Sequence, residues 1–355
     1  MPRILAVGTA LPQHAVTQEA AKALTRHLFQ NAYSDIDRLL AVFANSQIET
    51  RHFCVPLEWF AEEHAFAEKN RLFLEHAVNL CEQAIRRCLS QADCDVREVD
   101  CLVMVSSTGI ATPSLDARLL NRLGLREDLV RMPLWGLGCC GGAMGLSRAA
   151  DYARAYPSAL VLLVSVELCG LVFIKDDHSK SNLIATSLFA DGAAAVLVAG
   201  DQVPAGRIPP KAPSLIRSSS TTWPDTLDVM GWDLTDDGLK VIFSRDIPSI
   251  VKEHMRENVT AFLEADGLSP KQVQHYLLHP GGAKVLTAYR EALDLPADAT
   301  RPAEEVLSAC GNMSSATVLF VLERSLAAGW QSGDRGLMAA LGPGFSSELL
   351  LLHLE

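Results

Sequence analysis

The alternation of apolar and polar positions along the chain predicts an α/β protein. Its most apolar stretches are short and uninterrupted, as expected for strands of a sheet that is covered on both faces. These stretches are residues 1–8, 100–107, 159–166, 192–200, 273–278, 336–341 and 349–352. Apolar residues that recur at helical spacing predict three helices in the first half of the chain. These helices span residues 17–29, 58–89 and 113–125.

The second half of the chain repeats the order of the first. In each half a polar link precedes a buried strand, and a glycine-containing turn and a helix follow at nearly equal distances. Ser107 and Cys139 mark these positions in the first half, and His279 and Asn312 mark them in the second. The proline-rich residues 204–213 connect the halves, which we expect to be domains. Their predicted ranges are 1–203 and 214–355. Because ligands bind outside the carboxyl ends of strands, the matching ends should meet in one pocket.

Cys139 lies in a Gly-Cys-Cys-Gly-Gly turn between an apolar run and a helical pattern. At the start of a helix the dipole lowers a thiol pKa and favours the thiolate, so Cys139 is a candidate nucleophile. The alternative is a buried structural cysteine in a packing turn. Cys140 competes for the role, but its side chain is one step further on and is expected to point into the core.

Composition narrows the class of protein. The net charge of −11 argues against general nucleic-acid binding, which needs clustered Lys and Arg. The nine cysteines are odd in number and contain no pair of CxxC motifs, so reduced thiols are expected, with no metal site and no disulfide framework. No apolar run is long enough to span a membrane, and we expect a cytoplasmic protein.

Three polar residues are expected to converge, namely Cys139, His279 and Asn312. They suit acyl transfer through a thioester, with Cys139 as the nucleophile paired with the imidazolium of His279. Asn312 and the His279 ring can donate to a thioester oxygen and stabilise an enolate, at roughly 3 kcal/mol per donor. Taken alone, His279 is equally well explained as a core histidine and Asn312 as a turn residue.

Several motifs in order along the chain make it similar to the type III polyketide synthases, the chalcone-synthase-like branch of the thiolase superfamily. The motifs are Gly138-Cys139 with Gly141-Gly142, Leu188–Ala195, Gly238–Pro248, His279-Pro280-Gly281-Gly282, Gly311–Ala316 and Gly342-Pro343-Gly344. The resemblance implies a duplicated, five-layered αβαβα thiolase fold and a homodimer. It also implies an acyltransferase whose substrates are acyl-CoA and malonyl-CoA, without a bound cofactor.

The resemblance assigns roles by position. Cys139 accepts the starter acyl group, while His279 and Asn312 assist decarboxylation of malonyl-CoA. Phe189 is the gatekeeper phenylalanine between a CoA tunnel and a cavity. The remaining candidate substrate-binding residues are Thr112, Cys169, Val172, Trp232, Val241, Ser314 and Arg51.

Several of these candidates differ from the plant enzymes. Val241 replaces a second gatekeeper phenylalanine, and Val172 and Cys169 replace cavity threonines. Thr112 replaces the methionine that crosses the plant dimer, and Trp232 replaces a cavity glycine. The resemblance places Arg51 among the basic residues that contact CoA phosphates; a solvated surface arginine is the alternative.

An apolar, enlarged cavity favours an aliphatic chain, because each buried methylene contributes about 0.8 kcal/mol. We therefore expect a fatty acyl-CoA of medium or long chain to be extended with malonyl-CoA and released as an alkylpyrone or alkylresorcinol. One alternative is a phloroglucinol- or tetrahydroxynaphthalene-type product made from malonyl-CoA alone. The others are a single extension as in ketoacyl-ACP synthase III, or a catalytically silent protein of the same fold. Starter length, the number of extensions and the mode of ring closure do not follow from the sequence.

Overall fold

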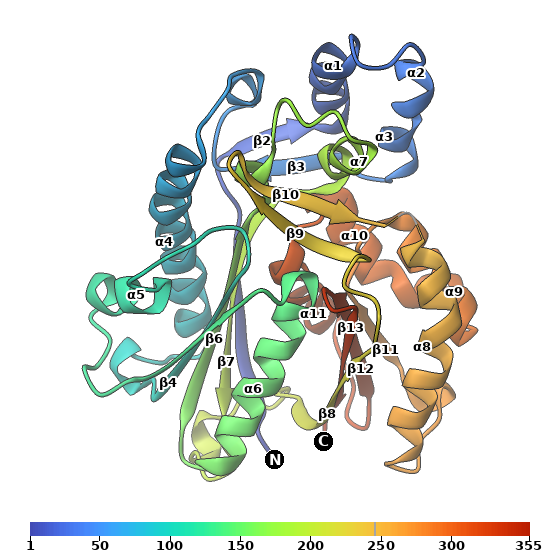
Figure 1. The fold of residues 1–355 in the computed structure, drawn as a ribbon. Helices are drawn as coiled ribbons and strands as arrows, with labels where there is room; N and C mark the ends of the chain where they lie inside the picture. The colour runs from blue at the N-terminus through green and yellow to red at the C-terminus, as the bar shows by residue number, and fades with distance from the viewer. Residues whose placement is uncertain (245) are drawn as a thin grey trace.

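The computed structural model describes residues 1–244 and 246–355. Arg245, which belongs to the segment 238–248 quoted above, lies outside the described residues. Figure 1 shows two packed α/β halves, with both termini at the end of the molecule opposite α1 (Gln18–Phe29) and α7 (Lys180–Leu188). The predicted α/β class is confirmed.

The first half carries five strands in the order β5-β4-β6-β7-β1. Their bounds are β1 Arg3–Ala10, β4 Cys101–Ser106, β5 Val130–Trp135, β6 Leu160–Leu168 and β7 Asp191–Ala199. Successive residues of β6 alternate between two cores, with Leu162 in one and Val161 and Leu163 in the other. Both faces of this part of the sheet are therefore buried, which explains why its strands read as continuous apolar runs.

The second half carries four strands in the order β11-β12-β13-β8. Their bounds are β8 Ser214–Thr222, β11 His275–Leu278, β12 Arg335–Gly342 and β13 Ser346–His353. A backbone pairing between Arg3 and Ser214 joins β1 to β8, so the two halves form one nine-stranded mixed sheet. Where the first half has β5, the second has the helix α10 (Arg301–Cys310), so the repetition is incomplete at that position.

Helices cover both outer faces and fill the space between the halves (Figure 1). The outer helices are α4 Phe66–Gln91, α5 Leu115–Leu123, α8 Ile247–Glu264 and α9 Ala283–Leu293. The inner pair is α6 Gly141–Ala155 and α11 Thr317–Ala327. α6 contacts strands of both halves, and α11 packs against α6, β1 and β11. The layers therefore run outer helices, the sheet of the first half, the inner helices, the sheet of the second half, and outer helices.

Smaller elements gather beyond the carboxyl ends of β4, β6 and β11 (Figure 1). They comprise α1, α7, α2 Ile36–Leu39, α3 Ala41–Asn45, β2 His14–Thr17, β3 Thr50–Phe53 and the hairpin of β9 Met230–Thr235 and β10 Gly238–Phe243. The predicted helix over 58–89 begins later than expected. Residues 57–61 form a short 3-10 turn, and α4 starts only at Phe66. Within 1–244 and 246–355, no helix has the length and apolar character needed to cross a membrane.

Candidate functional site

The turn that carries Cys139 is shaped by its glycines. After β5 the chain adopts positive φ at Gly136 and Gly138, and Cys139 lies in a single 3-10 turn directly before α6. A side chain at Gly142 would place its Cβ 2.1 Å from the carbonyl oxygen of Ser315. Glycine therefore allows the turn of the second half to pack directly on the start of α6.

Cys139 is buried beside the Asn312 turn. Its thiol donates a hydrogen bond to the Ser314 hydroxyl at 3.5 Å. Burial raises the pKa of Cys139 to about 11, although hydrogen bonds from Ser314 and Asn312 act in the opposite direction. The expectation of a resting thiolate is therefore wrong for this structure. Burial raises the pKa of the thiol more than the dipole at the start of the helix lowers it.

Asn312 connects three parts of the site. Its side-chain oxygen accepts from the Ser314 backbone N–H at 2.9 Å, and its amide nitrogen donates to the Gly281 carbonyl at 3.3 Å. Its backbone N–H donates to Leu188 O, and its carbonyl accepts from Ala190 N, both at 2.9 Å. The Asn312 turn thus holds the Cys139 turn, the loop after β11 and the segment around Phe189 together.

His279 follows β11 and is 3% exposed. Its backbone N–H donates to Ala339 O at 2.8 Å, which continues the pairing of β11 with β12. Neither ring nitrogen has a hydrogen-bond partner among the described residues. Burial lowers the pKa of His279 to about 3, so the ring is a neutral imidazole. The expected thiolate–imidazolium pair is accordingly replaced by a neutral thiol and a neutral imidazole.

Glu167, which the sequence analysis missed, is a buried carboxyl group at the end of β6. It accepts hydrogen bonds from Ser107 N at 2.9 Å, the Thr108 hydroxyl at 2.8 Å and the Ser315 hydroxyl at 2.5 Å. Burial raises its pKa to about 7, and its charge contributes to the raised pKa of Cys139. A single acidic residue inside the apolar run of β6 was the signal that could have identified it.

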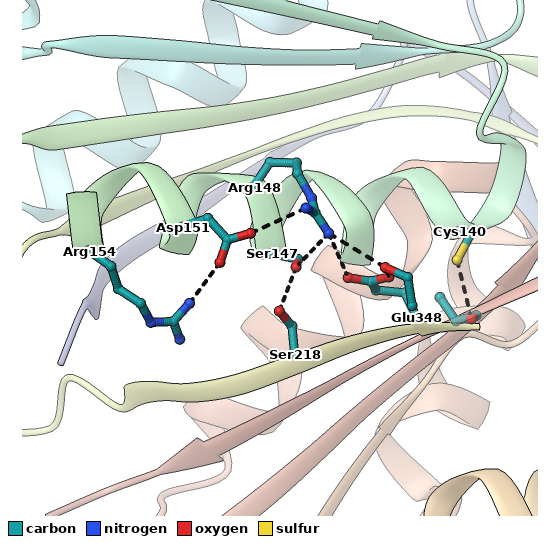
Figure 2. A network of polar contacts seen from close by, with 9 residues as sticks. Cys140, Ser147, Arg148, Asp151, Arg154, Ser218 and Glu348 are labelled. Carbon is teal, nitrogen blue, oxygen red and sulfur yellow. Dashed lines mark hydrogen bonds and ion pairs between the residues drawn. The ribbon is translucent and has the colours of Figure 1, made fainter. Parts of the chain in front are cut away.

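Cys140 points away from this cluster. It is fully buried, and its thiol donates to Ala340 O at 3.4 Å on the side of β12, as Figure 2 shows. Polar contacts on the same side fix α6 to the second half, including Ser147 to Ser218 at 2.7 Å and Arg148 to Glu348 at 3.7 Å. Cys140 therefore belongs to the packing of α6, as its position in the turn predicted.

An apolar pocket lies beside Phe189, the residue that pairs with Asn312. Most of the predicted substrate-binding residues line it, namely Arg51, Cys169, Val172, Phe189, Trp232 and Val241. Trp232 and Val241 are paired across the β9–β10 hairpin. Phe189 makes edge-on contacts with Trp232 and with Phe243, with ring centroids 6.1 and 6.3 Å apart. The hairpin and Phe189 therefore form one wall of this pocket.

A second space, the cation-rimmed groove, shares no lining residue with the apolar pocket. It is lined by residues of α2, α3, α7 and α9, by Leu188 and by Gly281 and Gly282. Three exposed cations stand among these residues, namely Arg38, Lys180 and Lys284. Cys139, His279 and Asn312 are buried and line neither space. Asn312 bonds to Gly281 of the groove lining and pairs with Phe189 of the pocket lining.

Arg51 requires a correction. It is 2% exposed, and its guanidinium donates to the carbonyl oxygens of Thr186 and Phe189 at 2.7 and 2.9 Å. Burial lowers its pKa to about 9. A side chain in this position holds the backbone of the Phe189 segment and is not available to CoA phosphates at the surface.

The two remaining candidates are placed differently from the rest. Ser314 is buried and contacts Cys139 directly. Thr112 is exposed and lines neither space. Residues 1–244 and 246–355 contain no cluster of His, Cys, Asp and Glu suited to a metal ion.

Comparison with known proteins agrees with this arrangement. The profile of the N-terminal domain of chalcone and stilbene synthases matches residues 1–202, and that of the C-terminal domain matches residues 214–354. A protein of Bacillus subtilis (strain 168) whose name contains the words chalcone synthase is 47% identical over 100% of this chain and 99% of its own.

Two further relatives differ in product. The α-pyrone synthesis polyketide synthase-like Pks18 of Mycobacterium tuberculosis (strain CDC 1551 / Oshkosh) is 30% identical over 99% of this chain and 90% of its own. The crystal structure of 1,3,6,8-tetrahydroxynaphthalene synthase from Streptomyces coelicolor A3(2), a bacterial type III polyketide synthase, superposes with a TM-score of 0.93. It is 28% identical and covers 99% of both chains.

Proposed function

We propose a starter and a product for this chain, which belongs to the chalcone and stilbene synthase family. It is a type III polyketide synthase of the thiolase fold that condenses CoA thioesters with malonyl-CoA. The starter is a fatty acyl-CoA of medium or long chain. The enzyme extends it by decarboxylative condensation with malonyl-CoA and releases an alkylpyrone or an alkylresorcinol.

The observation that carries this proposal is the character of the apolar pocket. Its walls combine Val172, Val241 and Phe173 with aromatic and aliphatic side chains from α1 and β3. An aliphatic chain gains about 0.8 kcal/mol for each methylene that leaves water for such a wall. The name of Pks18, a relative that covers nearly the whole chain, supports an α-pyrone as one product.

We assign the chemistry to the three buried residues Cys139, His279 and Asn312. The neutral His279 ring accepts the proton of Cys139 as the sulfur attacks the starter thioester, and CoA leaves as its thiol. Malonyl-CoA then loses CO₂, and the enolate that remains is stabilised by donors from His279 and Asn312. The enolate carbon attacks the acyl group on Cys139, forms a carbon–carbon bond and releases the cysteine.

The cation-rimmed groove is the proposed binding site of CoA. Arg38, Lys180 and Lys284 are exposed and suited to its phosphates, and they take the role first expected of Arg51. Gly281 and Gly282 also line this groove, which brings the pantetheine end to the loop that carries His279. The thioester is thereby directed toward Cys139.

Incubation with acyl-CoAs of graded length and labelled malonyl-CoA tests the proposal. We expect pyrones or resorcinols whose yield rises with chain length. Products formed only from aromatic or short starters would contradict the aliphatic assignment.

A second candidate is a tetrahydroxynaphthalene- or phloroglucinol-type product from malonyl-CoA alone. The buried thiol of Cys169 in the pocket wall favours it, as does the product named for the Streptomyces coelicolor relative. Aromatic products in the absence of any added starter would establish this alternative.

We also propose a cytoplasmic homodimer of two-domain subunits, 1–203 and 214–355, that needs no resident cofactor. The edge strand β5 and the loop before α5 carry exposed apolar side chains, with Trp135 56%, Ile110 41% and Val130 40% exposed. Thr112 is exposed in the same loop. A monomer by light scattering at micromolar concentration would contradict the dimer, and activity lost on dialysis against chelator would contradict the absence of a cofactor.

A further inference from the structure

One face of α1 forms part of the apolar pocket. Ala21, Leu24, Thr25 and Leu28 all line the pocket, and their spacing places them on a single side of the helix. α1 itself packs on α7 and on the turn at residues 57–61. This helical face is thus turned toward the apolar pocket.

The hydroxyl and amide groups that α1 and α7 contribute to the lining are bonded to the protein. Arg51, from β3, keeps two buried guanidinium nitrogens without a partner among the described residues. The Thr25 hydroxyl donates to Ala21 O at 2.9 Å, and the Thr186 hydroxyl donates to Leu183 O at 2.6 Å. The Asn182 amide donates to Ile174 O and Asp177 O at 2.8 and 2.7 Å. A ligand that reaches α1 therefore loses hydrogen bonds to water unless its own surface is apolar there.

The other end of the pocket lies near the proposed nucleophile. Cys169 and Gly170 directly follow β6, two and three residues after Glu167, and line the pocket. The pKa of Cys169 is raised first by burial and then by the charges of neighbours that include Cys139. The pocket lining therefore includes both Cys169, directly after β6, and the face of α1.

We propose that α1 forms the end wall of the acyl-binding pocket and limits the length of acyl chain that the enzyme accepts. Ala21 and Leu24 are the residues that set this limit. The inference rests on the aliphatic starter proposed above. The methyl end of the chain points toward α1 while its thioester carbonyl lies at Cys139. Chains that stop short leave the helical face without a contact, and chains that are too long are excluded by it.

The expected signature is a chain-length optimum. Each added methylene raises kcat/KM by about fourfold while it still enters the pocket. The increase stops when the chain meets α1. Filling the space at Ala21 moves this limit to shorter chains, and trimming Leu24 moves it to longer ones.

The test compares Ala21→Phe with Ala23→Phe, because Ala23 is an exposed residue of the same helix. Hexanoyl-, octanoyl-, dodecanoyl- and hexadecanoyl-CoA are assayed with labelled malonyl-CoA, and products are identified by mass. We expect Ala21→Phe to lower the kcat/KM ratio of the longest to the shortest accepted starter by about tenfold or more. Ala23→Phe should leave this ratio within about twofold of the unmodified protein.

Leu24→Ala provides an independent test that adds no bulk. It should shift the optimum toward longer starters while octanoyl-CoA is used at a similar rate. An unchanged chain-length profile in both Ala21→Phe and Leu24→Ala would overturn the role of α1 while leaving the aliphatic starter intact. If the unmodified protein uses none of the four acyl-CoAs, the proposed starter itself fails.

Discussion

The apolar pocket and the cation-rimmed groove lie on either side of two consecutive residues. Leu188 lines the groove and Phe189 lines the pocket. Leu188 is the last residue of α7, and Phe189 is the extended residue that follows it. The backbone of Asn312 bonds to Leu188 O and Ala190 N, so one backbone pairing fixes both residues at the point where the chain leaves the helix.

The difference between the two spaces is one of chemistry. The groove offers exposed cations, while the pocket offers mainly apolar side chains, and Thr25 and Asn182 in its lining are already bonded to the protein. A thioester with an anionic carrier at one end and an aliphatic chain at the other matches this division. In the proposed function, the two parts of such a substrate meet at Cys139, His279 and Asn312.

The largest effect is expected where the two parts of the substrate meet. Cys139→Ala should lower product formation at least about 10³-fold, because both substrate ends remain bound while no sulfur is present to accept the acyl group. Cys140→Ala is the matched control, since its thiol bonds Ala340 O on the far side of the turn. We expect activity within a few-fold of the unmodified protein, and intact mass after incubation with acyl-CoA should show acylation in this variant only. Retention of acylation by Cys139→Ala would assign the nucleophile to another residue.

Elements with strong periodicity could be predicted from the sequence alone. The apolar runs correspond to β4, β6, β7 and β12. They could be recognised because a strand that is buried on both faces is apolar at successive positions. The matching positions of Cys139 and Asn312 in the repeat also predicted that distant segments would meet, and Ser314 now connects the two.

Protonation and burial could not be predicted in the same way. A position before a helix indicated a thiolate at Cys139, but the pKa depends on how completely the other half of the protein excludes water. The resemblance placed Arg51 among the basic residues that contact CoA phosphates, whereas its guanidinium is buried and bonded to carbonyl oxygens of Thr186 in α7 and of Phe189. Glu167 was overlooked because its partners come from two separate turns, Ser107 and Thr108 from one and Ser315 from the other.

The second prediction asks whether the buried surroundings of Cys139 stay uncharged. The folded protein raises the pKa of Glu167 from its ordinary 4.5 to about 7 through burial, so it retains a proton that the unfolded chain releases above 4.5. The free energy of unfolding should therefore fall by roughly 3 kcal/mol from this group as pH rises from about 4.5 to 7. Glu167→Gln removes this contribution.

Denaturant unfolding of both proteins between pH 5 and 8 measures the effect. The lowered pKa of His279 acts in the opposite direction, since stability from that ring is lost as pH falls below about 6.5. The difference between the two proteins cancels the histidine and isolates Glu167. A difference that does not change with pH would mean that Glu167 is ionised throughout.

The third prediction concerns the groove alone. Lys284→Glu should raise KM for the CoA thioester about tenfold at low salt, because an attractive charge at the phosphates becomes repulsive. The effect should shrink at high ionic strength, while kcat and chain-length preference remain unchanged. Lys211→Glu, an exposed residue outside the groove lining, should leave KM unaltered. A salt-independent rise in KM would indicate that Lys284→Glu alters the fold of the groove.

The smallest effect is expected from a single hydroxyl in the apolar pocket. Val172→Thr keeps the shape of the side chain but leaves a donor that an aliphatic chain cannot satisfy, so kcat/KM for a long starter should fall about fivefold. Val42→Thr makes the same change in the groove, where water and phosphate oxygens can accept the bond, and should leave chain preference unchanged. Steady-state kinetics with octanoyl- and hexadecanoyl-CoA separate the two. Equal losses in both variants would show that the pocket and the groove do not divide the substrate as proposed.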